Sequence, residues 1–174
     1  MTYNVKPGSR VLLTGATGRI GTDFRQYAAD RYELRLAAHH PEKLAGVTGF
    51  DIVPLELADP DSCAAACEGM EAVVHLGGNP SGRAPFYPTI LESNIEGTYN
   101  ILRAAKDAGC RRVVLSSSVQ AVTGYPLDHQ VRTSDAVRPV NMYGVAKCFM
   151  EACAHNFAAS EGLSCIVIRV GHYQ

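Results

Sequence analysis

Hydrophobic residues in this chain are concentrated in six short runs, which are separated by longer segments of mixed polarity. In several of these segments the hydrophobic residues recur every three to four positions, as Ile20, Phe24 and Tyr27 do, which predicts helices. The predicted strands are Arg10–Thr14, Glu33–Ala38, Phe50–Leu55, Ala72–Leu76, Arg111–Ser116 and Ser164–Val170. The predicted helices are Arg19–Asp30, a short helix that starts at Asp59-Pro60-Asp61, Thr89–Ala108 and Tyr143–Ser160.

Short apolar strands that alternate with helices are typical of a parallel sheet with helices on both faces. We therefore predict an α/β fold: one doubly wound Rossmann domain over residues 1–174, with α/β/α layers and the strand order 3-2-1-4-5-6. Ligands of such sheets bind at the carboxyl ends of the first and fourth strands, where Gly15–Gly21 and Gly77-Gly78 would meet. The connection Ser117–Met142 is too long for a simple turn, which indicates a functional segment.

The first strand leads directly into a turn with the pattern T-G-x-x-G-x-x-G, which opens the first helix. The N-terminus of a helix presents unpaired N–H groups and positive charge, and glycines let a diphosphate approach the backbone. The spacing differs from the commoner G-x-G-x-x-G. The turn predicts a dinucleotide site, and a plain tight strand–helix turn is the alternative. The residues expected to contact the dinucleotide here are Gly15, Thr17, Gly18, Arg19, Ile20 and Gly21.

Charge and composition narrow the classes of partner. The net charge is −1 and no basic excess is present, so we expect no nucleic-acid partner. No apolar stretch approaches the roughly 18 residues of a membrane span, and residues 1–10 lack the apolar core of a signal peptide. We therefore expect a cytoplasmic protein without a membrane partner. The six cysteines form no C-x-x-C pair, and no spacing of His, Cys or carboxylate residues predicts a metal site.

A tyrosine and a lysine stand four residues apart in Tyr143-Gly144-Val145-Ala146-Lys147, which puts them on one helix face, one turn apart. A tyrosine with its usual pKa near 10 is a poor base at neutral pH until something stabilises the phenolate, as a nearby ammonium does. Ser118, at the end of the fifth strand, could donate a hydrogen bond to a substrate oxygen. An ordinary surface pair and a polar loop serine are the alternatives.

Five segments of the chain are informative as a set, because of their order along the chain and the spacing between them. They are Thr14–Gly21, His75–Gly78, Asn94–Asn100, Val114–Ser118 and Tyr143–Lys147. Together they resemble the extended short-chain dehydrogenase/reductase family, which comprises NAD-dependent epimerases and dehydratases. The resemblance implies that Tyr143 is the general base or acid, that Lys147 binds the nicotinamide ribose and lowers the tyrosine pKa, and that Ser118 orients the substrate. It also implies a homodimer through the two long helices, and cofactor contacts from Leu76, Gly77, Gly78, Asn94, Ser116, Ser117, Tyr143 and Lys147.

The second predicted strand ends at Ala38, without the carboxylate that binds the ribose diol in many NAD sites. His39 and His40 follow and could contact a 2′-phosphate, more strongly when protonated, so NADP is favoured over NAD. Two solvated loop histidines are the alternative, and the glycine turn suits either cofactor. Glu56-Leu57, after the third strand, is similar to the Asp-Leu pair that faces adenine in the family.

Within the family, the chain is most similar to uronate dehydrogenases, through Val74–Gly78, Gly124-Tyr125-Pro126, Tyr143–Phe149 and Arg169-Val170-Gly171. The resemblance implies oxidation of a sugar or sugar acid, with hydride transfer to the nicotinamide. Two substrate-side positions differ, because Val119-Gln120 replaces Asn-His and His172 replaces a serine. Family members continue beyond the last strand. The alternatives are a non-catalytic NAD(P)-binding module or sensor, half of a nucleotide-sugar epimerase or dehydratase, and an enzyme completed by a partner chain.

Overall fold

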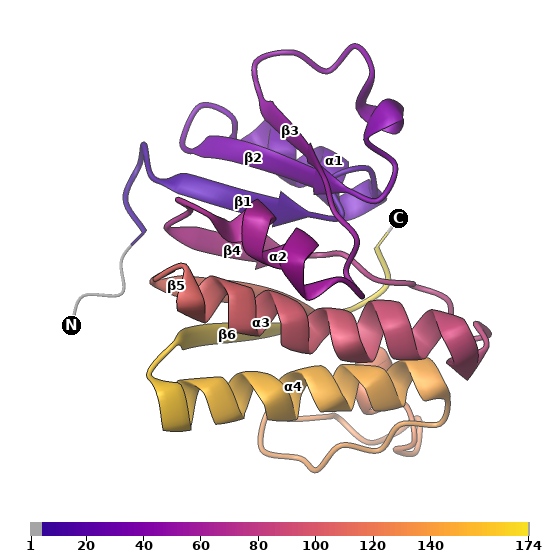
Figure 1. Ribbon diagram of the computed structural model, residues 1–174. Coiled ribbons are helices and arrows are strands. Elements are labelled where there is room, and N and C mark those ends of the chain that lie inside the picture. The colour runs from indigo at the N-terminus through magenta and orange to yellow at the C-terminus, as the bar shows by residue number, and fades with distance from the viewer. Residues whose placement is uncertain (1–4, 174) are drawn as a thin grey trace.

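The computed structural model, which describes residues 5–173, consists of a six-stranded parallel sheet between two layers of helices (Figure 1). The strand order is β3-β2-β1-β4-β5-β6 and every neighbouring pair is parallel, which confirms the predicted fold class and order. The strands are β1 (Arg10–Thr14), β2 (Glu33–Ala38), β3 (Asp51–Pro54), β4 (Ala72–His75), β5 (Arg112–Ser118) and β6 (Ser164–Val170). The helices are α1 (Arg19–Ala28), α2 (Pro60–Cys67), α3 (Gly97–Asp107) and α4 (Met142–Glu161), with 3₁₀ turns η1 (Pro41–Leu44) and η3 (Val119–Ala121) and a wide π-type segment η2 (Phe86–Glu96).

Alternate residues of each strand face opposite layers of helices. Leu12 of β1 and Val73 of β4 are fully buried against α2, α3 and α4, which lie in front of the sheet in Figure 1. Leu13 and Leu36 face the other side, where they belong to a second buried cluster with Ala28 of α1. The two clusters hold the sheet from both faces, so the carboxyl ends of the central strands form a rigid base for a site.

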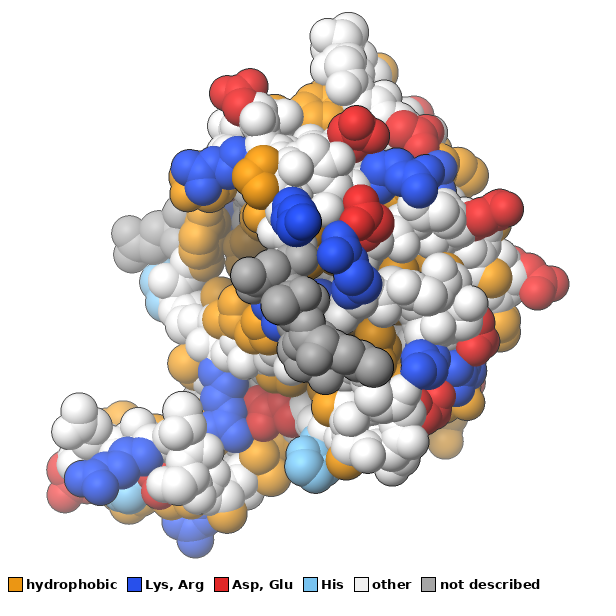
Figure 2. Space-filling model, turned by 90° about the vertical axis from the view of Figure 1, so that its left-hand side faces the viewer, with side chains coloured by type: hydrophobic (Ala, Val, Ile, Leu, Met, Phe, Trp, Pro, Cys, Tyr) orange, Lys and Arg blue, Asp and Glu red, His pale blue; other side chains and the backbone are white. Residues whose placement is uncertain are grey.

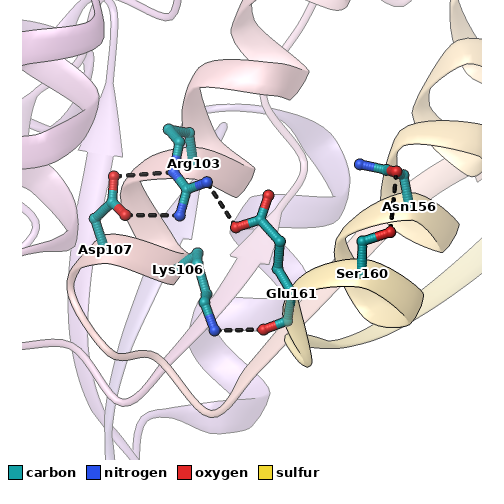
Figure 3. Close-up of polar contacts among 6 residues, drawn as sticks. All are labelled: Arg103, Lys106, Asp107, Asn156, Ser160 and Glu161. Carbon is teal, nitrogen blue, oxygen red and sulfur yellow. Dashed lines mark hydrogen bonds and ion pairs between the residues drawn. The ribbon is translucent and has the colours of Figure 1, made fainter.

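An ion-pair network joins the C-terminal ends of α3 and α4 (Figure 3). Arg103 of α3 binds Asp107, one turn further along, and Glu161 at the end of α4, each at 2.6 Å. Lys106 donates a hydrogen bond to the backbone carbonyl of Glu161. These contacts fix the end of α4 relative to α3, at the far end of the helix from Tyr143.

The surface around the amino ends of the strands carries mixed charge. Figure 2 shows Lys and Arg side chains interspersed with Asp and Glu side chains on this face. Arg111 pairs with Glu71, and Arg35 pairs with Asp51 at 2.6 Å. Across residues 5–173, no helix is long and apolar enough to cross a membrane, and no group of three or more His, Cys, Asp or Glu residues could hold a metal ion.

Strand β5 is longer than predicted. It continues to Ser118, because Ser117 pairs in register with Arg169 of β6 and Ser118 pairs with Val170. Both serines are nearly buried, so the neighbouring strand compensates for the weak strand propensity of serine. The serines therefore belong to the sheet rather than to the long connection.

The predicted helix Thr89–Ala108 is instead two elements, η2 and α3. Gly97 stands at their junction, where an added Cβ would lie 2.7 Å from Cβ of Leu57. The backbone stays helical across the junction, since Glu96 and Gly97 both have right-handed helical φ and ψ. The other predicted elements have their ends within two residues of the observed ones.

Candidate active site

The turn between β1 and α1 leaves no room for side chains. Gly15 has a φ of +68°, and a Cβ there would lie 2.8 Å from the backbone nitrogen of Gly77. A Cβ on Gly21 would lie 2.3 Å from the carbonyl oxygen of Gly15. Helix α1 begins after Gly18 without a side-chain cap, so its first N–H groups are available to an anion. This cradle fits the diphosphate of a dinucleotide.

Buried side chains join the ends of β1 and β4 beneath this turn. Oγ1 of Thr14 accepts a hydrogen bond from the Gly77 nitrogen at 3.0 Å and lies 2.8 Å from Nδ1 of His75. Burial lowers the pKa of His75 to about 3, and the charge of Lys147 acts in the same direction. His75 is therefore neutral and supports the floor of the cleft. Its Nε2 has no hydrogen-bond partner within the described part of the chain.

A cleft of about 1180 Å³ crosses the carboxyl ends of the strands. All but one of the predicted site residues line it: Gly15, Thr17, Gly18, Arg19, Ile20, Gly21, His39, His40, Glu56, Leu57, Leu76, Gly77, Gly78, Ser116, Ser117, Ser118, Tyr143 and Lys147. The exception is Asn94, which is 2% exposed. Asn94 accepts from the backbone nitrogen of Asn79 at 2.9 Å and donates to its carbonyl at 3.0 Å. It holds the loop after Gly78 from behind.

The cleft also contains residues that were not among the predicted site residues. Lys43 lines the end near β2, Gln120 follows the end of β5, and residues 170–173 pass beside α1. The Tyr173 hydroxyl is hydrogen-bonded to Asp23 of α1. No motif marks Lys43 or Tyr173, because contacts between segments that are far apart in the sequence bring them to the cleft. Gln120 and His172, by contrast, stand at the two substrate-side positions where the sequence differs from uronate dehydrogenases.

The start of α4 places Tyr143 over the end of β5. Asn141 caps the helix, since its Oδ1 accepts from the Gly144 nitrogen at 2.8 Å. Gly144 packs directly against the turn after β5, where a Cβ would lie 2.4 Å from the carbonyl oxygen of Gln120. This close approach brings the Tyr143 hydroxyl into a hydrogen bond with Ser118. Only glycine allows the helix to start so near the strand end.

Lys147 is buried next to Tyr143. Its Nζ donates to the Ser116 carbonyl at 2.7 Å and lies 5.4 Å from the centre of the tyrosine ring. Burial lowers the pKa of Lys147 to about 8. Burial also raises the pKa of Tyr143, against the opposing effect of the hydrogen bond with Ser118. The net direction for Tyr143 is opposite to that implied by the family resemblance, because loss of solvent outweighs the hydrogen bond.

A network of polar contacts around the Glu151 carboxylate lies one turn beyond Lys147 along α4. Glu151 forms a bidentate pair with Arg169 of β6, at 2.8 and 2.9 Å, and accepts from the Ser117 hydroxyl at 2.5 Å. Ser117 thus binds Glu151 in the middle of α4, while Ser118, the last residue of β5, is hydrogen-bonded to Tyr143 at the start of the same helix. Glu151 was not among the predicted site residues, although its spacing of four residues from Lys147 could have indicated it.

The opposite end of the cleft carries both acidic and basic groups. Nδ1 of His39 lies 2.8 Å from a carboxylate oxygen of Glu56, and Nδ1 of His40 lies 3.1 Å from one of Glu42. All four side chains are at least half exposed. A 2′-phosphate here would meet the carboxylates as well as the histidines, whereas a ribose hydroxyl could donate to Glu56.

Known proteins share this arrangement of strands. The model of the NAD dependent epimerase/dehydratase family matches residues 11–173. The chain belongs to this family. Family membership confirms the resemblance that the motifs predict. Among curated relatives, a uronate dehydrogenase of Agrobacterium fabrum is 37% identical over 93% of the chain and 60% of its own length. An NAD-dependent glucose-6-phosphate dehydrogenase of Haloferax volcanii is 31% identical over 93% of the chain and 68% of its own length.

Solved structures of the family agree with the fold. The crystal structure of uronate dehydrogenase from Agrobacterium tumefaciens has a TM-score of 0.87 at 35% identity, over 94% of this chain and 61% of that one. A mutant of the same enzyme complexed with NAD has a TM-score of 0.83 at 34% identity, over 90% and 58% of the two chains. The chain thus spans about three fifths of the length of the uronate dehydrogenases that it matches.

Proposed function

We propose that this chain forms the cofactor-binding and proton-transfer part of an NAD(P)-dependent dehydrogenase that oxidises a sugar or sugar acid. The observation that carries the proposal is the convergence of Ser118, Tyr143 and Lys147 on the cleft that the glycine turn opens into. The sugar class is supported by relatives named as uronate, glucose-6-phosphate and L-arabinose dehydrogenases. The likeness to UDP-galactose 4-epimerase, at 24% identity, concerns the fold alone.

The cofactor would lie along the whole cleft. Gly15 and the first turn of α1 would bind the diphosphate, Glu56 and His39 would contact the adenosine, and Lys147 would bind the nicotinamide ribose. When bound, the oxidised nicotinamide accepts a hydride and adds positive charge beside Tyr143. We assign a dinucleotide rather than a smaller phosphate ester because the glycine turn and the start of α1 fit a diphosphate.

Tyr143 would act as the general base that takes the proton of the reacting hydroxyl. Deprotonation of Tyr143 to the phenolate is unfavourable in this structure, because burial raises the pKa of Tyr143. Lowering a tyrosine pKa by roughly three units requires about 4 kcal/mol. The ammonium of Lys147 and the bound cofactor supply positive charge in a partly dry cleft, where charges interact strongly. Ser118 would hold the substrate oxygen in line with Tyr143.

We also propose that two copies associate through α3 and α4, which lie side by side in Figure 1. Tyr99 of α3 and Met142 and Val145 of α4 are 49%, 43% and 40% exposed, and an interface would cover them. Sedimentation equilibrium tests this, and a monomer at all concentrations would contradict it. A cytoplasmic location stays a sequence-based prediction.

The decisive experiment separates binding from turnover. NADH and NADPH are titrated by calorimetry, and NADH formation is then followed with D-glucuronate, D-glucose 6-phosphate and L-arabinose. Tyr143→Phe should keep the affinity for NADH and lose turnover, since it removes only the phenolic proton carrier. Turnover that survives this change overturns the assigned base. Cofactor binding without turnover of any sugar by the wild type would favour a non-catalytic NAD(P)-binding module.

A further inference from the structure

The three residues that follow β6 connect two distant parts of the cleft. Strand β6 ends at Val170, which pairs in register with Ser118, so the segment starts beside the end of β5. Residues 171–173, which we call the strap, have no regular secondary structure and all line the cleft. At its other end the strap reaches α1 through Tyr173. Figure 1 shows this yellow segment running from β6 toward α1.

The strap has little slack between its two ends. Two strands, β5 and β4, separate β6 from β1, the strand that leads into α1. Neighbouring strands lie about 4.8 Å apart, so three steps across the sheet cover roughly 14 Å. Three residues of extended chain span at most about 11 Å, and the long side chain of Tyr173 covers the remaining distance. The strap therefore passes directly over the carboxyl ends of the central strands.

Tyr173 joins the strap to one face of α1. Its hydroxyl donates a hydrogen bond to the carboxylate of Asp23, and we call this bond the latch. Its carbonyl oxygen accepts a longer bond from Nη1 of Arg19, at 3.5 Å. Arg19 and Asp23 are four residues apart, so they lie one turn apart on the same helix face. Both contacts are exposed, so they can open without uncovering a buried core.

The strap and the expected cofactor share the same strand ends. A dinucleotide with its diphosphate at Gly15 and its nicotinamide ribose at Lys147 would extend from β1 toward β5, beside the strap. We propose that the strap is a gate for the dinucleotide, and that the latch between Tyr173 and Asp23 opens each time the cofactor enters or leaves. The proposal rests on the dinucleotide site proposed above. The latch atoms bind each other and not the cofactor, so the gate sets the rates of exchange rather than the affinity.

The rates of NADH exchange test the gate. Association is followed by stopped-flow fluorescence of NADH, and dissociation by displacement with excess NAD⁺. Tyr173→Phe removes the hydroxyl and keeps the ring, so both rate constants should rise about fivefold, while their ratio, Kd, should change less than about twofold. Tyr27→Phe is the matched control, because Tyr27 lies on the same helix and is 67% exposed, and both rates should stay at the wild-type values.

The acceptor side of the latch provides an independent test. Asp23→Ala should raise both rates by the same factor as Tyr173→Phe, and the double variant should be no faster than either single variant, because each change alone opens the latch. Asp23→Asn keeps an acceptor oxygen without the charge, so a smaller rise is expected.

Three results would contradict the proposal in different ways. Wild-type rates in Tyr173→Phe or in Asp23→Ala overturn the gate. Faster dissociation with unchanged association also overturns it, because that result identifies Tyr173 as an ordinary contact of the bound cofactor. If the wild type binds neither NADH nor NADPH, the dinucleotide site itself is refuted, and the gate with it.

Discussion

Replacing Glu151 by glutamine should weaken the junction of β5, β6 and α4. Glu151 accepts one hydrogen bond from Ser117, at 2.5 Å, and two from Arg169, at 2.8 and 2.9 Å. Glutamine has nearly the same shape but only one side-chain acceptor and no charge, so the bidentate ion pair is lost. The Arg169 guanidinium would then lack its counter-charge beside the end of β6.

The size of the effect follows from the burial of the pair. Hydrogen bonds to charged groups contribute about 1.5–3 kcal/mol each. The Arg169 and Glu151 side chains are 25% and 18% exposed, so solvent screens part of the interaction between their charges. We expect a loss of about 2 kcal/mol in the free energy of unfolding. For a chain of this size, that lowers Tm by roughly 4–8 °C. Asp107→Asn, which breaks the exposed pair in Figure 3, is the matched control and should cost less than about 1 kcal/mol.

The effect should also depend on pH. Burial by itself would raise the pKa of Glu151, but hydrogen bonds from Arg169 and Ser117 hold it below its usual value of 4.5. Because the folded pKa is the lower one, ionised Glu151 stabilises the fold above the unfolded pKa, and this contribution disappears as pH falls through the folded pKa. Urea denaturation of wild type and variant should show a difference that shrinks below pH 4.5. A difference that does not change with pH, or that equals the control, would refute the reasoning.

Three further changes test the site. Gly15→Ala introduces a Cβ 2.8 Å from the Gly77 nitrogen, and calorimetry should show NADH affinity reduced more than tenfold. The free energy of unfolding of the wild type should rise between about pH 8 and pH 10.5, because over that range its unfolded state binds more protons than its folded state. Lys147→Met should abolish this rise, which urea denaturation measures. Gly144→Ala should displace Tyr143 and lower kcat about 100-fold, whereas exposed Val145→Ala should not.

Much of the fold could be predicted because its signals are local. Six apolar runs, the helical spacing between them and the turn before α1 each depend on neighbouring residues, and together they gave the correct strand order. The close approach of Gly97 to Leu57, at the junction of η2 and α3, could not be predicted, because the two residues are far apart in the sequence. The extension of β5 to Ser118 likewise depends on pairing with β6.

In the candidate site, too, some features have local signals in the sequence and others depend on contacts between distant segments. The glycine turn and the Tyr143–Lys147 spacing are visible in the sequence, since each lies within one element. The serine run could not be resolved there, because only the strand register sends Ser117 to Glu151 and Ser118 to Tyr143. The contact between Asn141 and Gln120 bridges two ends of a long connection and has no local signal.

The burial of His75 has a practical consequence for spectroscopy. A ring that is fully enclosed, neutral and bonded to Thr14 through Nδ1 should hold one tautomer and exchange its proton slowly. Its NMR signal would stay constant between pH 5 and pH 8. His75 can therefore serve as an internal reporter for the contact between β1 and β4, which records whether the floor of the cleft is intact without any added ligand.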